Sequence, residues 1–192
     1  MAHTEAGIDD RGAGRSLRRR GRFEHTYAAL DLGTNNCRLL VARALDDGFR
    51  VIDAFSRIVR LGEGLAGSGR LSEAAMARTI EALRICAAKL DRRGVTRLRA
   101  VATEACRKAV NCADFVEYVA AETGLSLEII SAAEEARLAL AGCAPLLDYD
   151  NRHALVFDIG GGSPTIMWLR LEDGKPPHLL GWLSIPLGVV TL

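Results

Sequence analysis

Two acidic, glycine-containing turns carry the residues best suited to chemistry. Residues 31–35 read Asp-Leu-Gly-Thr-Asn, and residues 158–163 read Asp-Ile-Gly-Gly-Gly-Ser. In both places an apolar strand runs into Asp-x-Gly, where glycine permits a sharp turn and the backbone N–H groups that follow can converge on an oxyanion. An aspartate at the end of a strand can hold a hydrated cation. A phosphate chain bound between two such turns is the first functional hypothesis.

The two turns belong to an internal repeat. One Asp-x-Gly-Thr turn is weak evidence, because ordinary hairpin turns have this composition. Both copies, however, continue through a second strand to an acidic turn at 45–48 or 171–174, and then through a third strand to Leu-Gly at 61–62 or 187–188. Three consecutive glycines cost chain entropy, which close approach of the backbone to a ligand would explain. The long period excludes a solenoid and predicts two similar domains.

The apolar pattern predicts a mixed α/β fold. The predicted strands are 27–32, 36–45, 49–60, 97–102, 125–130, 154–158, 164–171 and 178–186. The predicted helices run from Ser72 to just before Gly94, over 112–123 and over 132–141. We therefore expect a disordered basic tail at 1–25, a first domain at 26–143, and the beginning of a second domain, truncated, at 144–192. A three-stranded sheet with one uncovered face is marginal, so residues 145–192 are expected to exchange amide hydrogens quickly or to drive association.

Composition excludes several classes of protein. The net charge is +1, and no run of about 18 apolar residues could cross a membrane. The arginines of the tail could contact nucleic acid, but we prefer a solvated tail and predict no specific nucleic-acid partner. The tail lacks the apolar segment of a signal peptide. Five scattered cysteines without Cys-x-x-Cys favour buried thiols in the reducing cytoplasm over a metal cluster or disulfides.

Charged residues outside the two turns are ambiguous by spacing alone. Ser131 and Glu134 match a capping box, which gives Glu134 a structural role at the start of a helix. Glu135 lies in the same helical turn, and its spacing favours a solvent-exposed side chain. Three arginines could clamp an anion, because guanidinium groups suit multidentate phosphate contacts. They are Arg57, Arg60 and Arg107.

Taken together, these blocks resemble the amino-terminal portion of the exopolyphosphatase/guanosine pentaphosphate phosphohydrolase (Ppx/GppA) family, which belongs to the actin–Hsp70–sugar-kinase superfamily. The matching blocks are residues 31–35, 60–65, 102–107 with Asn111, 129–137 and 158–163. They occur in the family's order and cover roughly residues 26–192. The resemblance implies a ribonuclease-H-like α/β domain followed by the start of a second, incomplete copy. It also implies a cytoplasmic protein whose full-length form is a homodimer.

The resemblance further implies a reaction and roles for particular residues. The reaction is Mg²⁺-dependent hydrolysis of the terminal phosphoanhydride of inorganic polyphosphate, or of the 5′ γ-phosphate of guanosine pentaphosphate. Glu135 would be the general base that orients water, in place of the solvent-exposed interpretation, and Asp31 and Asp158 would place the metal. The implied phosphate-binding residues are Thr34, Asn35, Arg60, Arg107, Gly160, Gly161 and Ser163.

The sequence departs from the family at two positions, and it leaves alternatives open. Pro164-Thr165 stands where the family has Thr-Glu, so a carboxylate expected near the metal is missing, although Glu104 could take over its role. Ala132 replaces the usual glycine. An ATP-dependent sugar or acetate-type kinase of the same superfamily is one alternative, and a phosphopolymer-binding fragment without turnover is another. Polyphosphate and guanosine pentaphosphate both present a terminal phosphoanhydride, so the sequence does not separate them.

Overall fold

The computed structural model describes residues 25–46, 48–185 and 188, so the predicted basic tail lies outside the described residues except for His25. The described elements follow the order β1 (Thr26–Leu32), β2 (Asn36–Leu45), β3 (Gly48–Ile58), α1 (Leu65–Ser68), α2 (Glu73–Arg92), β4 (Arg97–Ala102), α3 (Glu104–Lys108), α4 (Cys112–Thr123), β5 (Glu128–Ile129), α5 (Ala132–Cys143), the 3₁₀ turn η1 (Ala144–Leu146), β6 (His153–Ile159), β7 (Pro164–Arg170) and β8 (His178–Ser184).

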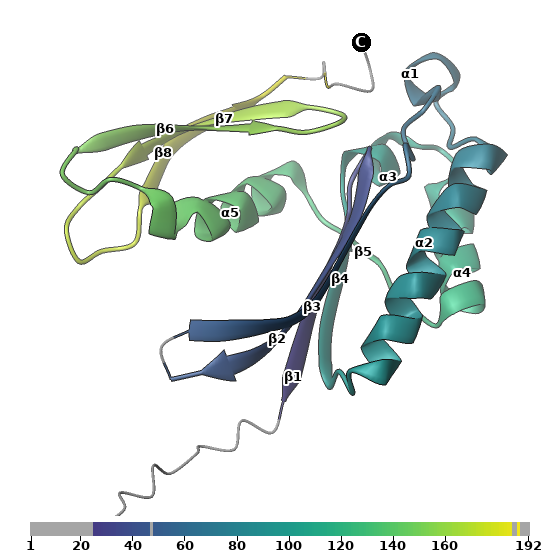
Figure 1. Ribbon diagram of the computed structural model, residues 1–192. Coiled ribbons are helices and arrows are strands. Elements are labelled where there is room, and N and C mark those ends of the chain that lie inside the picture. The colour runs from purple at the N-terminus through teal and green to yellow at the C-terminus, as the bar shows by residue number, and fades with distance from the viewer. Residues whose placement is uncertain (1–24, 47, 186–187, 189–192) are drawn as a thin grey trace, which may run out of the picture.

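The first sheet has the strand order β3-β2-β1-β4-β5. β1, β2 and β3 form an antiparallel series, whereas β4 and β5 continue parallel to β1. Alternate residues of β1 and β2, such as Leu30 and Leu39, face a core that is closed by α2 and α4 on one side of the sheet (Figure 1). The period of two in these strands is what one buried sheet face requires. The predicted ribonuclease-H-like α/β fold is confirmed.

The second sheet is an antiparallel meander of β6, β7 and β8. α5 lies along one of its faces (Figure 1), and Ala136 and Leu140 pack with apolar residues of β7 and the residue after it. The opposite face carries exposed Leu155, Phe157 and Trp168. The sequence assigned α5 to the first domain, but its apolar side packs against the second sheet. The domain boundaries and the rapid exchange of residues 145–192 stay predictions.

Several predicted elements differ from those observed. The third strand ends at Ile58 rather than at residue 60, because the N–H groups of Val59 and Arg60 leave the ladder and donate to the Asn35 carbonyl at 2.8 and 3.0 Å. The strand predicted at 125–130 pairs only over Glu128–Ile129. The short helices α1 and α3 were not predicted. α1 has a single turn between two glycines in the left-handed conformation, which is too short to give a periodic apolar pattern.

Asn111, one of the family-like residues, has a structural role in this fold. Its side chain is buried, accepts a hydrogen bond from the Leu71 N–H at 2.9 Å and donates one to the Leu71 carbonyl at 3.1 Å. We expect Asn111→Ala to lower the free energy of unfolding by about 2–4 kcal/mol, because two buried backbone groups lose their partner. Urea unfolding measures this loss. Asn151→Ala, at an exposed turn, is the control, and an equal loss in both variants would contradict the assignment.

Candidate functional site

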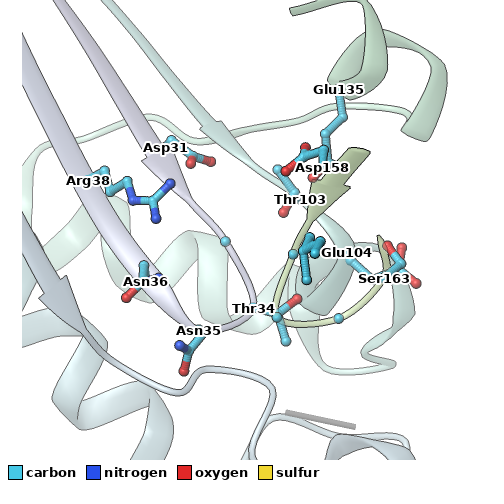
Figure 2. A pocket seen from close by; sticks show the side chains of 15 residues that line it. Asp31, Thr34, Asn35, Asn36, Arg38, Thr103, Glu104, Glu135, Asp158 and Ser163 are labelled. Atoms are coloured by element: carbon cyan, nitrogen blue, oxygen red, sulfur yellow. The ribbon is translucent and has the colours of Figure 1, made fainter. Parts of the chain in front are cut away.

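A pocket of about 210 Å³ lies where the two Asp-x-Gly turns meet (Figure 2). One turn joins β1 to β2, and the other joins β6 to β7, so the two sheets contribute equivalent parts of the repeat to one site. α3 and the first turn of α5 complete the wall. The lining residues are Asp31, Gly33, Thr34, Asn35, Asn36, Arg38, Thr103, Glu104, Glu135, Asp158, Ile159, Gly160, Gly161, Gly162 and Ser163.

The glycines of the second turn allow the two turns to touch. A Cβ atom added at Gly161 would lie 2.7 Å from the Asn35 Cβ and 3.1 Å from the Asn35 backbone nitrogen. A Cβ at Gly162 would lie 2.6 Å from the Thr34 hydroxyl oxygen and 2.9 Å from the Glu104 Cγ. The sequence suggested that a ligand requires these glycines. In the structure, close contact already favours glycine at both positions, because an added Cβ would come within 3.0 Å of the neighbouring atoms and force them to shift.

Carboxylates face one another across the pocket. Burial raises the pKa of Asp31; Arg38 counteracts this shift, and the nearby charges of Glu135 and Asp158 raise the pKa further. Mutually repelling carboxylates suit a hard divalent cation. Mg²⁺ commonly uses one or two protein carboxylates and completes its octahedron with water and phosphate oxygens. Within the described residues no group of three Asp, Glu, His or Cys side chains forms a ready-made metal cluster. A cation at Asp31 and Asp158 would need water or phosphate oxygens to complete its shell, and the metal role of these two residues stays a prediction.

Glu135 is held at the pocket by an ion pair. Its Oε2 accepts a hydrogen bond from Arg107 at 2.8 Å, and the same guanidinium binds Glu104 at 2.8 Å and the Ile130 carbonyl at 2.8 Å. Burial favours the neutral form of Glu104, but Lys108 and Arg107 outweigh this effect and lower its pKa. Arg107 therefore compensates two carboxylates that line the pocket and keeps them close to each other.

The structure brings most of the predicted site residues together. Those that line the pocket are Glu135, Asp31, Asp158, Thr34, Asn35, Gly160, Gly161 and Ser163. Arg107 lies behind Glu104 and Glu135, outside the lining. Arg60 also lies outside it, in a left-handed backbone conformation with φ 48°, and its carbonyl faces the Arg78 guanidinium at 3.5 Å. The chemical roles of all these residues stay predictions.

Arg38 is the most informative lining residue that the sequence did not single out. It lies on β2 directly opposite Asp31 of β1, and its guanidinium points toward the pocket (Figure 2). It forms no ion pair with another described residue. The strand pattern held a usable signal, because Cys37 and Leu39 are buried and the residue between them must face the other side. Asn36 and Thr103 were also absent from the predicted site, and Glu104, considered only as a replacement for the missing carboxylate, lines the pocket.

Paired Asp-x-Gly turns from two sheets, facing one pocket beside a ribonuclease-H-like core, define a protein of the actin–Hsp70–sugar-kinase class. Within this class, the model of the Ppx/GppA phosphatase family matches residues 40–192. The chain belongs to the Ppx/GppA phosphatase family.

Solved structures agree with this assignment. A Ppx/GppA family member from Aquifex aeolicus is 34% identical with a TM-score of 0.70, over 86% of this chain and 52% of that one. An exopolyphosphatase from Cytophaga hutchinsonii is 26% identical with a TM-score of 0.80, over 87% and 52%. The chain thus spans about half the length of these relatives. None of the described helices is long and apolar enough to cross a membrane. The cytoplasmic location and the homodimer stay predictions.

Proposed function

We propose that this chain binds the terminal phosphate of inorganic polyphosphate between its two Asp-x-Gly turns, and that the whole protein hydrolyses the terminal phosphoanhydride. Guanosine pentaphosphate, which ends in the same kind of bond, is the second candidate substrate. One observation carries the proposal. Two turns that lie about 125 residues apart in the sequence face a single pocket, and Glu135 belongs to the lining of that pocket.

Phosphoryl transfer needs positioning and charge neutralisation more than covalent chemistry. The backbone N–H groups of Gly160 and Gly161 would bind phosphate oxygens, together with the side chains of Thr34, Asn35 and Ser163. Arg38 would add a positive charge at the same pocket. A backbone cradle of this kind holds an anion without reorganisation, which is the main advantage of preorganised donors.

Asp31 and Asp158 would hold the divalent cation, which when bound would neutralise charge on the phosphate oxygens. Glu135 would orient the attacking water and accept its proton as the new P–O bond forms and the leaving phosphate takes the electrons of the old one. The guanidinium of Arg107, 2.8 Å from Oε2 of Glu135, would hold the carboxylate in place at the pocket while it accepts the proton.

Phosphate release tests the proposal. The purified whole protein is incubated with inorganic polyphosphate and MgCl₂, beside its Glu135→Gln variant, and free phosphate is measured over time. Release that the variant loses supports the proposal, and equal release by both proteins contradicts the role of Glu135. Binding of polyphosphate without release by either protein would favour the phosphopolymer-binding alternative. Transfer of the γ-phosphate of ATP to a sugar would favour the kinase alternative.

Thr165 should limit the affinity for the cation. It lies directly opposite Asp158 in the β6–β7 ladder, where opposed Cβ atoms are about 4.5–5.5 Å apart. Thr165→Glu would place a second carboxylate beside Asp158, whereas Glu104 already binds Arg107 and Lys108. We expect this variant to bind Mg²⁺ more tightly than the natural chain in isothermal titration calorimetry. Thr165→Gln, which adds size without charge, should not. Unchanged or weaker binding in Thr165→Glu would contradict the missing-carboxylate argument.

A further inference from the structure

The first turn of α5 joins two parts of the fold that pack separately. The helix packs against the second sheet through Ala136 and Leu140, but the chain enters it from β5 of the first sheet. A second cavity, of about 410 Å³, separates α5 from the open face of β1 and β4, and Val101 and Leu138 belong to its lining. Close packing therefore does not fix the start of α5 against the first sheet.

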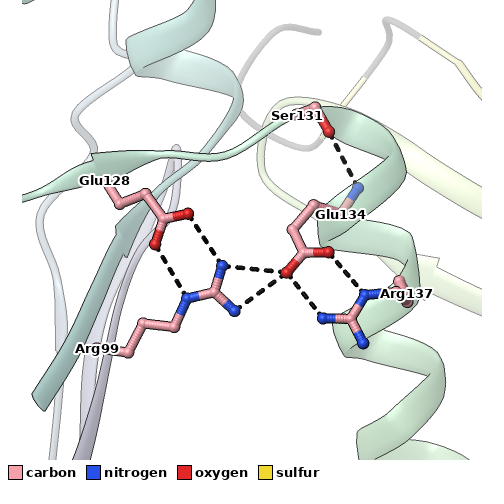
Figure 3. A network of polar contacts seen from close by, with 5 residues as sticks. All are labelled: Arg99, Glu128, Ser131, Glu134 and Arg137. Carbon is pink, nitrogen blue, oxygen red and sulfur yellow. Dashed lines mark hydrogen bonds and ion pairs between the residues drawn. The ribbon is translucent and has the colours of Figure 1, made fainter.

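Charged side chains bridge this space instead (Figure 3). Arg99 of β4 makes two hydrogen bonds of 3.0 Å with the Glu128 carboxylate of β5. The same guanidinium donates to Oε1 of Glu134, in α5, at 3.0 and 3.1 Å. Glu134 also accepts hydrogen bonds from Arg137, one turn further along the helix, at 2.7 and 2.9 Å. Arg99 is thus the residue that connects the first sheet to Glu134 of α5.

Arg107 provides a second link, to the next residue of the helix. It donates to Glu135 and to the Ile130 carbonyl, both at 2.8 Å. Side chains of consecutive helical residues point about 100° apart. The contacts of Glu134 with Arg99 and of Glu135 with Arg107 therefore constrain the helix from two different directions. A single contact would leave the first turn of α5 free to rotate about the helix axis. Two links in different directions fix its rotation as well as its position.

We propose that Arg99 is a positioning residue that, through Glu134, holds the first turn of α5 in the rotation that directs Glu135 into the pocket. This inference rests on the proposed function, because the rotation matters for turnover only if Glu135 is the general base. The network sets the orientation of the first turn of α5 and adds little to the free energy of unfolding. The Arg99 side chain is 42% exposed, and exposed ion pairs contribute little free energy, whereas a two-pronged guanidinium contact defines an orientation.

Hydrogen exchange in the natural chain and in Arg99→Gln tests the positioning step. The reporter is the Glu135 amide, which donates to the Ser131 carbonyl at 2.9 Å and closes the first turn. We expect it to exchange about fivefold faster in Arg99→Gln, with no change at Leu140 in the middle of the helix. Arg137→Gln is the matched control, because Arg137 contacts Glu134 only from within the helix. Equal rates in Arg99→Gln and the natural chain, or the same increase in Arg137→Gln, would overturn the proposal.

Kinetics of phosphate release from polyphosphate test the consequence for the reaction. Arg99→Gln should lower kcat and leave KM unchanged, because the residue touches no substrate. Arg99→Lys should restore part of kcat, since lysine keeps the charge but not the planar fork. A change in KM alone would overturn the proposal, because Arg99 would then contact the substrate. If the whole protein releases no phosphate, the proposed function fails, while the exchange rates still decide whether Arg99 holds the helix.

Discussion

Glu135→Gln is expected to lower the rate of phosphate release by at least about 10²-fold, the loss typical of a positioned general base. The amide keeps the size of the side chain, and its oxygen can still accept the hydrogen bond that Arg107 gives to Glu135 at 2.8 Å. What the variant loses is the proton acceptor. Polyphosphate binding should therefore remain nearly intact, and a binding titration beside the rate measurement checks this.

Two further variants distinguish loss of the proton acceptor at position 135 from a structural effect of the substitution. Glu135→Asp keeps the charge but withdraws the carboxylate by one methylene, so its rate should fall between those of the natural chain and Glu135→Gln. Glu172→Gln removes an exposed carboxylate that pairs with Lys175 and does not line the pocket, and its rate should not change. Normal turnover by Glu135→Gln would show that Glu135 is a surface residue with a structural ion pair, as its spacing alone suggested.

The repeat and the strand patterns were readable from the sequence because they depend on local order. Alternation of buried and exposed residues in β1 and β2 follows from one buried face. Each of the two Asp-x-Gly turns lies at the end of a strand, β1 or β6. The family blocks then connected the two turns to one reaction. The ion pair between Arg107 and Glu135 joins residues 28 positions apart, and no local pattern determines such a pair.

The sequence did not show which sheet α5 packs against, and the reason is related. An amphipathic helix shows that it has an apolar face but not which sheet will cover it. Glu134 satisfies the capping-box pattern, and the structure confirms that the Ser131 hydroxyl accepts its N–H at 3.2 Å. That local pattern does not predict the ion pair that the Glu134 side chain makes with Arg99 of β4. A residue whose local pattern is fully explained can still carry a long-range contact.

The contact between the two Asp-x-Gly turns could not be predicted from the sequence either. The Gly161→Ala variant tests whether this contact matters for function. The added methyl group would meet the Asn35 Cβ at 2.7 Å and the Asn35 backbone nitrogen at 3.1 Å. Neither atom belongs to the flexible end of a side chain, and carbon atoms prefer separations of about 3.5–4.0 Å. The turns must therefore move apart by roughly 1 Å, a displacement that can reduce a reaction rate about 10²-fold.

We expect Gly161→Ala to bind polyphosphate more weakly and to release phosphate about 10²-fold more slowly, because the phosphate would no longer reach donors on both turns. Calorimetric titration with inorganic polyphosphate measures the first effect. Gly142→Ala is the matched control: it lies in α5, an added Cβ there would meet nothing within 4 Å, and it should bind and react as the natural chain does. If Gly161→Ala binds and hydrolyses polyphosphate normally, the phosphate does not lie between the turns. The two copies of the repeat would then meet for structural reasons alone.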